Sequence, residues 1–297
     1  MAETERKPMD EQEYTTYPRQ FPSYRWYKPL LVGLLFVVFM LVLMFAADFI
    51  STLIFGVTAD SAGYDDMDLY TAAGAFKNCL MAIIPIPALF LAAGIVRDRP
   101  ISSYLSSMGG WRWKIFARTF AAAFVIMGIP TIIQYLVQGR TGDIRFTLGG
   151  FLILTVLAPF QGFAEELTYR GYMMQTVSSW FRLPAAGVIV QLIFFTLVHP
   201  YNLVGVIAIA VSALIYALVC IFSRGLEAGT ALHIVNNMTE IYMAGFGFGM
   251  ITAEQTVGDS IFNIALKVLF FVFILYAQKK LHWFDAAEQE ETAEAVA

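Results

Sequence analysis

The sequence predicts an all-α fold, a polytopic membrane bundle of about eight transmembrane helices with both termini in the cytoplasm. Of its 297 residues, 58% are hydrophobic and only 14% are charged, whereas soluble domains carry about a quarter charged residues. Several stretches of about twenty residues are almost free of charge, and a helix of that length crosses a bilayer. This composition excludes a soluble nucleic-acid-binding protein, and two cysteines provide no disulfide framework.

Three parts follow one another along the chain. Residues 1–29 are polar and predict a mobile cytoplasmic tail, residues 30–283 a membrane helical domain, and residues 284–297 an acidic cytoplasmic tail. Within the membrane domain, hydropathy predicts spans at residues 30–57, 71–96, 114–137, 147–170, 184–200, 203–223, 228–246 and 260–278.

The basic residues indicate the orientation. Most of the 19 Lys and Arg residues fall in the tails and in the loops on the same side, while the opposite loops contain only Arg140 and Arg145. The positive-inside rule therefore places both termini in the cytoplasm. Short loops and the lack of an added domain favour a multi-pass protein of a bacterial plasma membrane.

Ionisable side chains within spans are energetically costly, so each is expected to be paired or functional. Asp48, Lys77, Glu240 and Lys267 lie toward the outer halves of their spans. They predict a set of ion pairs that ties four spans together, and a proton or ion pathway is the alternative.

A second polar group lies toward the inner halves of three other spans, and its members are Glu165, Glu166, Arg170, His199, His233 and Asn237. Because residues four apart share a helix face, Glu166 is expected to pair with Arg170. Glu165 is rotated by about 100° from Glu166, so its carboxylate is left free for chemistry. Taken singly, each residue also fits a structural role, such as a solvated helix end or a hydrogen bond between helices.

Together these residue types suit hydrolysis of an amide bond inside the membrane or at its edge. A carboxylate can take a proton from a water molecule that an imidazole orients, and Glu165 and His199 suit that role. A second imidazole and an amide can stabilise the negative charge that develops on a carbonyl oxygen. His233 and Asn237 suit this oxyanion site.

Three motifs point to a known family. Glu165-Glu166-Leu-Thr-Tyr-Arg170 has the pattern Glu-Glu-x-x-x-Arg, Phe195-Thr-Leu-Val-His199 has Phe-x-x-x-His, and His233-Ile-Val-Asn-Asn237 has His-x-x-x-Asn. In this order, on successive spans, they resemble the CAAX protease and bacteriocin-processing (CPBP, Abi) family of intramembrane proteases, related to the type II CAAX prenyl endopeptidases. The resemblance covers about residues 115–245.

The resemblance implies an intramembrane endopeptidase that cuts a peptide or lipidated protein near the cytoplasmic membrane face. It implies that Glu165 and His199 activate water and that His233 and Asn237 form the oxyanion site. The remaining motif positions, Glu166, Arg170 and Phe195, are expected to support them. The alternative is a non-catalytic membrane scaffold or bacteriocin-immunity protein that binds a peptide partner, and a transporter is third. Substrate identity, its prenylation and the oligomeric state do not follow from the residues.

Metal dependence stays open. Glu165, His199 and His233 could supply three ligands of a catalytic zinc ion, with Asn237 on the substrate. The glutamate scheme needs no metal, and we favour no obligatory cofactor. The zinc-protease motif His-Glu-x-x-His is absent from the sequence, as are the serine and aspartyl intramembrane protease motifs.

Helix geometry tests whether these residues can meet. If the helix that contains Glu165 runs to about Phe181 and the next one climbs from about Pro184, Glu165 and His199 lie at nearly the same level. A straight span 203–223 would leave His233 roughly 15–20 Å from that level. A kink or strong tilt near residues 200–205 is therefore expected.

Overall fold

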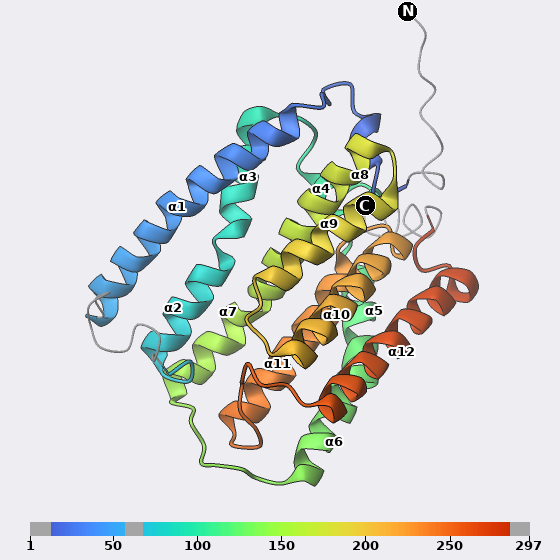
Figure 1. The fold of residues 1–297 in the computed structure, drawn as a ribbon. Helices are drawn as coiled ribbons and strands as arrows, with labels where there is room; N and C mark the ends of the chain where they lie inside the picture. The colour runs from blue at the N-terminus through green and yellow to red at the C-terminus, as the bar shows by residue number, and fades with distance from the viewer. Residues whose placement is uncertain (1–12, 57–67, 286–297) are drawn as a thin grey trace, which may run out of the picture.

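The computed structural model describes residues 13–56 and 68–285, and over these residues it is a bundle of helices (Figure 1). The described part contains no strand beyond an isolated bridge between Ser106 and Gly225. In chain order the elements are η2 (Tyr17–Gln20), α1 (Lys28–Phe55), α2 (Ala72–Ile83), α3 (Pro85–Val96), α4 (Ser102–Leu105), α5 (Trp113–Ala123), η3 (Phe124–Gly128), α6 (Ile129–Gln138), α7 (Leu148–Glu166), η4 (Leu167–Met174), α8 (Gln175–Phe181), α9 (Pro184–Leu197), α10 (Leu203–Phe222), α11 (Glu227–Gly245) and α12 (Val257–Leu281). The all-α prediction is confirmed.

Six helical stretches of the described chain are long and apolar enough to cross a membrane. They are Lys28–Phe55, Ala72–Val96, Trp113–Gln138, Leu148–Phe181, Leu203–Phe222 and Val257–Leu281. The chain is therefore a multi-pass membrane protein. The exposed apolar side chains of α1, among them Phe45 at 77% and Leu53 at 74% exposure, suit contact with lipid.

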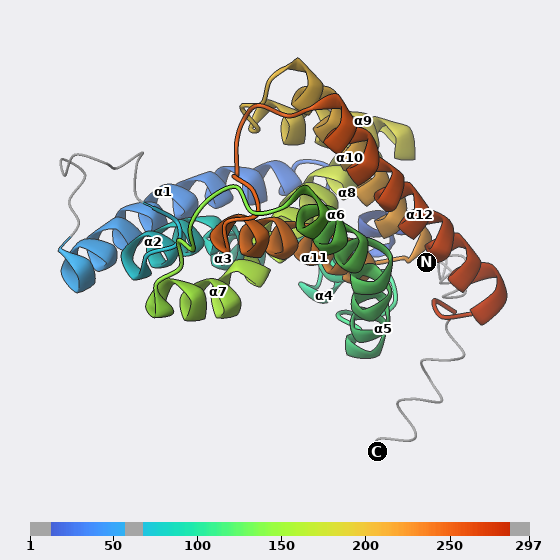
Figure 2. The same cartoon turned by 90° about the horizontal axis from the view of Figure 1, so that it is seen from below.

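The other two expected spans form helices of a different kind. α9 has 14 residues, about 21 Å, which is shorter than the hydrocarbon layer of about 30 Å. α11 has 19 residues but carries Glu, His and Asn along its length. Every residue from Glu227 to Val235 is buried, and Figure 2 shows α11 between α7 and α10 in the middle of the bundle. The count of eight spans stays a prediction.

α1 begins and α12 ends at the same end of the bundle, where α3 and α8 also end (Figure 1). At the opposite end, four helices begin with a polar N-cap. The side chains of Thr71, Thr147, Asn202 and Thr256 accept the backbone N–H groups of Gly74, Gly150, Gly205 and Asp259. These caps satisfy amides that the membrane would otherwise leave unpaired. The sides of the membrane on which the two ends lie stay a prediction.

The segment before α1 differs from the mobile tail expected at residues 1–29. From residue 13 onward the segment packs on the bundle, while residues 1–12 lie outside the described residues. Tyr14 is 1% exposed and its hydroxyl donates to the carbonyl oxygen of Tyr104 at 3.2 Å. Arg19 donates to the carbonyl oxygen of Ser179 at 2.9 Å. The polar composition of residues 1–29 did not predict this packing, because only a few aromatic side chains make the contacts. Of the expected acidic tail, residues 286–297 are likewise outside the described part.

The outer-half charges form one of the expected ion pairs. Lys77 Nζ lies 3.1 Å from Asp48 Oδ1 and ties α2 to α1. Glu240 instead accepts a hydrogen bond from the Tyr135 hydroxyl. Lys267 donates to Ser212 and Asn263. The direct ion pair is therefore confirmed for Asp48 and Lys77, whereas the charges of Glu240 and Lys267 interact with each other while their hydrogen bonds go to neutral groups.

Candidate active site

Glu166 and Arg170 lie one turn apart where α7 passes into the π-helical segment η4. Arg170 Nη1 donates to Glu166 Oε1 at 3.0 Å, and neither side chain has exposed surface. Arg170 Nη2 also donates to the carbonyl oxygen of Ala213 in α10 at 3.1 Å. His233 Nδ1 donates to the same Glu166 oxygen at 2.8 Å. The expected ion pair is present, and these two donors compensate the charge of Glu166.

The neighbouring Glu165 has a different environment. Its Oε1 accepts a hydrogen bond from Gln161 Nε2 at 3.2 Å. Its Oε2 is buried and accepts no hydrogen bond from the part of the chain that the structure describes. His233 Nε2 lies 3.6 Å from this oxygen. The two adjacent carboxylates therefore differ. Glu166 accepts hydrogen bonds from Arg170 and His233, whereas Glu165 has an oxygen available for another group.

His199 follows the end of α9, and a hydrogen bond fixes its tautomer. Its Nδ1 lies 2.6 Å from the carbonyl oxygen of Phe195. Because a carbonyl oxygen only accepts, Nδ1 carries the proton and Nε2 of the neutral ring is an acceptor. The Phe195 ring, 1% exposed, lies 4.7 Å from the His199 ring and 6.3 Å from the His233 ring. Phe195 therefore brings both imidazoles to one aromatic side chain.

His233 lies between the two carboxylates. Nδ1 donates to Glu166, Nε2 faces Glu165, and the ring of Tyr216 stacks on the imidazole at 4.8 Å with an interplanar angle of 16°. Donation from Nε2 to a further acceptor requires the doubly protonated imidazole, because Nδ1 already donates.

Asn237 lies one turn after His233 on α11. Its Oδ1 accepts a hydrogen bond from Asn236 Nδ2 at 2.9 Å. The amide oxygen is thus engaged, and the Nδ2 group is the part of the side chain that is left to bind another molecule.

Two glycines allow the helices to approach. A Cβ atom on Gly162 of α7 would lie 3.3 Å from the backbone nitrogen of Ile234. A Cβ atom on Gly229 of α11 would lie 2.6 Å from Cys220 Sγ and 3.1 Å from Glu166 Oε2. Small residues at such crossings bring backbones together in membrane proteins. Glu165 follows Gly162 by one turn and so meets His233.

The contact between His233 and Glu165 corrects the expected gap of roughly 15–20 Å between their levels. The end of α10 and the start of α11 lie at the level of Glu166, as the contacts of Cys220 and Gly229 with that carboxylate show. The stretch Leu148–Phe181 has 34 residues, roughly 50 Å, and therefore extends well past this level. Counting depth from Phe181 caused the error, and the expected kink or strong tilt near residues 200–205 stays a prediction.

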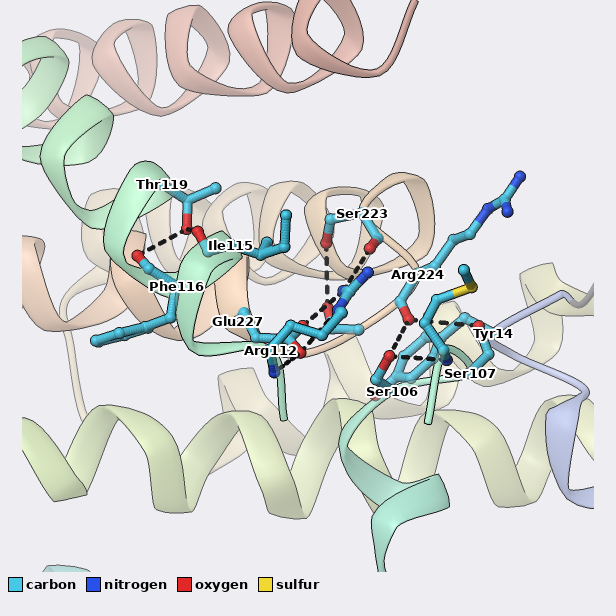
Figure 3. A network of polar contacts seen from close by, with 12 residues as sticks. Tyr14, Ser106, Ser107, Arg112, Ile115, Phe116, Thr119, Ser223, Arg224 and Glu227 are labelled. Atoms are coloured by element: carbon cyan, nitrogen blue, oxygen red, sulfur yellow. Dashed lines mark hydrogen bonds and ion pairs between the residues drawn. The ribbon is translucent and has the colours of Figure 1, made fainter. Parts of the chain in front are cut away.

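The start of α11 is fixed by a buried ion pair that the sequence analysis missed. Arg112 donates through its backbone N and Nε to Glu227 Oε1 at 2.9 Å and through Nη2 to Oε2 at 2.7 Å. Nη2 also donates to the carbonyl oxygen of Ser223, and Figure 3 shows this network. Glu227 is fully buried. The sequence placed it in a loop, so its burial was not expected.

The zinc alternative requires Glu165, His199 and His233 to converge on one point. Glu165 Oε2 and His233 Nε2 are 3.6 Å apart, but over residues 13–56 and 68–285 no group of three or more His, Cys, Asp or Glu side chains is arranged to hold a metal ion. His233 Nδ1 donates to Glu166, which leaves Nε2 for another partner. The preference for a metal-independent site stays a prediction.

Three further residues touch the site, and sequence reasoning did not single them out. Gln161 holds Glu165, Tyr216 stacks on His233, and Asn236 bonds to Asn237. Gln161 stands four residues before Glu165, so helix spacing could have revealed it. Tyr216 comes from another helix, and no local signal predicts it.

Residues 147–239 match the model of the family described as type II CAAX prenyl endopeptidase Rce1-like. This part of the chain is therefore similar to the Rce1-like family. The recognition drawn from the three motifs is confirmed, and the matched region includes all of them. The match to this family suggests a CAAX-type intramembrane protease activity, and such an activity implies a peptide or protein substrate.

A distant relative extends the similarity beyond the Rce1-like domain. The uncharacterized protein YyaK of Bacillus subtilis (strain 168) is 22% identical over an alignment of 226 residues, which covers 69% of this chain and 76% of YyaK. A search of solved structures gives no match.

Proposed function

We propose that this protein is an intramembrane endopeptidase of the CAAX prenyl protease type, in which Glu165 is the general base. The observation that carries the proposal is the contrast between the two carboxylates. Glu166 is neutralised by Arg170 and His233, whereas Glu165 Oε2 is buried without a hydrogen bond in the described chain, next to an imidazole. Buried ionisable groups that lack a partner are candidates for function.

In the first step a water molecule bound by Glu165 Oε2 attacks the carbonyl carbon of the scissile peptide. Glu165 takes one proton of the water, and His199 Nε2 accepts a hydrogen bond from its other O–H group, which orients the oxygen for attack. The tautomer fixed by the Phe195 carbonyl leaves His199 Nε2 free to do so.

In the second step the carbonyl oxygen carries a negative charge. Protonated His233 donates from Nε2, and Asn237 donates from Nδ2, so two hydrogen bonds stabilise the oxyanion. When the C–N bond breaks, Glu165 returns its proton to the leaving amine, which restores the carboxylate. No metal ion is needed for any of these transfers.

We further propose that residues 115–245 form the catalytic part of a membrane domain spanning residues 30–283. The substrate is a peptide or lipidated protein that reaches the site from the bilayer, near the cytoplasmic face of a bacterial plasma membrane. The position of Glu166 level with the inner ends of α10 and α11 supports a cut close to that face.

The test uses purified full-length protein in liposomes and a panel of peptides ending in Cys-aliphatic-aliphatic-X, each farnesylated or unmodified. A fluorophore and a quencher flank the Cys, so cleavage gives a signal. Wild-type protein is compared with Glu165→Ala, with and without a chelator. We expect cleavage that survives the chelator and is lost in the variant.

Two outcomes would contradict parts of this proposal. Loss of cleavage with the chelator and recovery with zinc would assign ligand roles to Glu165, His199 and His233. Wild-type protein that binds the peptides without cutting any of them would favour the scaffold or immunity alternative.

A further inference from the structure

Lys267 is a charged residue in the membrane-spanning helix α12 that none of the three motifs explains. It is 4% exposed, so its charge must be compensated inside the bundle. Its Nζ donates to Ser212 Oγ in α10 at 3.0 Å and to Asn263 Oδ1, one turn earlier in α12, at 2.5 Å.

The contact with Asn263 begins a chain of amides that ends at Asn237. Asn263 Nδ2 donates to Asn236 Oδ1 at 3.1 Å, and Asn236 Nδ2 donates to Asn237 Oδ1 at 2.9 Å. Three hydrogen bonds therefore connect the ammonium group of α12 to the side chain assigned to the oxyanion site on α11.

Lys267 determines which atoms donate and which accept in this series of hydrogen bonds. An amide side chain can flip and exchange its oxygen for its nitrogen, but an ammonium group has donors only. Asn263 must therefore present its oxygen to Lys267 and its nitrogen to Asn236. Asn236 must in turn present its nitrogen to Asn237, and Asn237 is left with Nδ2 as its outward group.

A second contact brings the charge of Lys267 close to His233, the other proposed oxyanion donor. Lys267 Nζ lies 5.7 Å from the centre of the Tyr216 ring, and Tyr216 stacks on His233 at 4.8 Å. In a medium of low dielectric constant, a fixed positive charge near both donors also favours a negative charge on the substrate oxygen.

We propose that Lys267 is a positioning residue for peptide hydrolysis, which fixes the Asn237 amide with Nδ2 toward the reacting carbonyl oxygen. This inference rests on the proposed function. Lys267 itself touches no reacting atom and acts through Asn263, Asn236 and Asn237.

The first test compares kcat and KM for the farnesylated peptide in Lys267→Met, which keeps the length of the side chain and removes the donors. We expect kcat to fall about 10- to 100-fold, as when a hydrogen-bond partner that orients a metal-ligating side chain is removed, with KM changed less than about twofold. Lys77→Met is the matched control, because Lys77 is a buried membrane lysine paired with Asp48 away from the site. Its kcat per folded protein should stay near the wild-type value.

The second test is a double-mutant cycle with Asn237→Ala. If Lys267 acts mainly through Asn237, Lys267→Met lowers kcat by a much larger factor in the wild type than in Asn237→Ala, where only its contact through Tyr216 and His233 is left. A general loss of packing would instead lower kcat by the same factor in both backgrounds, and that result would overturn the inference.

Asn263→Asp tests the direction of the chain with an almost isosteric side chain. The carboxylate still accepts from Lys267 but cannot donate to Asn236, so kcat should fall as in Lys267→Met. If Asn263→Asp has the wild-type kcat and an unchanged thermal unfolding temperature, the hydrogen bonds from Lys267 to Asn237 do not have the proposed role.

The cycle also separates this inference from the proposed function. If Asn237→Ala or Glu165→Gln cleaves at the wild-type rate, or wild-type protein cleaves nothing, the proposed function fails and the role of Lys267 with it. If both of those variants are inactive and Lys267→Met has wild-type kcat, only the inference about Lys267 fails.

Discussion

Glu165 and Glu166 are adjacent in the chain, yet they meet different partners. The spacing of four residues between Glu166 and Arg170 was enough to predict their ion pair from the sequence. The bonds from His233 to Glu166 and from Asn236 to Asn237 were not predicted. The first joins two helices, and the second depends on an amide orientation that begins at Lys267. Sequence spacing therefore revealed contacts within a helix and missed those that depend on packing.

The buried pair of Glu166 and Arg170 gives a prediction about stability. Arg170→Met leaves the Glu166 carboxylate buried with fewer donors, and such losses typically cost about 3–5 kcal/mol. Unfolding in mixed micelles with increasing SDS measures the free energy of unfolding. Combining Arg170→Met with Glu166→Gln should recover part of the loss, because the uncompensated charge is then removed.

Arg145→Met is the matched control for that prediction. Arg145 pairs with Asp68 at 3.0 Å, but both side chains are about 40% exposed, and exposed pairs contribute about 0–1 kcal/mol. Equal losses in Arg145→Met and Arg170→Met would contradict the structural role assigned to the buried pair.

At the scale of the helices, Gly229 is expected to control the approach of α11 to Glu166. In Gly229→Ala the new methyl group would meet Cys220 Sγ and Glu166 Oε2, so α11 must shift and carry His233 with it. We expect a loss of peptide cleavage of at least about tenfold, since small displacements at reacting groups lower rates strongly. The rate is measured on folded protein after size-exclusion chromatography.

Gly258→Ala provides the control for Gly229→Ala. Gly258 lies in the first turn of α12, and a Cβ atom there meets nothing within 4 Å. This variant should cleave at the wild-type rate. Unchanged cleavage in Gly229→Ala would show that the close crossing does not position the site.

The helices also show where hydropathy was informative and where it was not. The long apolar stretches became helices at the expected residues, because the bilayer requires a complete set of backbone hydrogen bonds within each segment. Hydropathy predicted a span at residues 228–246, but α11 is not among the described helices that are apolar enough to cross a membrane. Its first half is buried among other helices and does not face lipid. The expected level of His233 was wrong for a related reason, because helices do not all end at one plane.

At the scale of the whole molecule, the orientation is still a prediction and can be measured. Arg140 lies in the exposed loop between α6 and α7, and Lys280 lies in the exposed last turn of α12. With both termini in the cytoplasm, a membrane-impermeant maleimide should label Arg140→Cys in intact cells and Lys280→Cys only after permeabilisation. Cys79 and Cys220 are buried and should add little background. The reverse pattern of labelling would contradict the positive-inside assignment.

The central claim is that Glu165, and not another buried membrane carboxylate, activates the water. The most direct measurement is the cleavage rate of the farnesylated peptide by Glu165→Gln beside Glu240→Gln, which alters a glutamate that lies three residues after Asn237 on α11 and is bound to Tyr135. Removal of a general base lowers rates by about 10²–10⁴-fold, so Glu165→Gln should lose at least that factor while Glu240→Gln stays close to the wild type. Wild-type cleavage by Glu165→Gln would contradict the account.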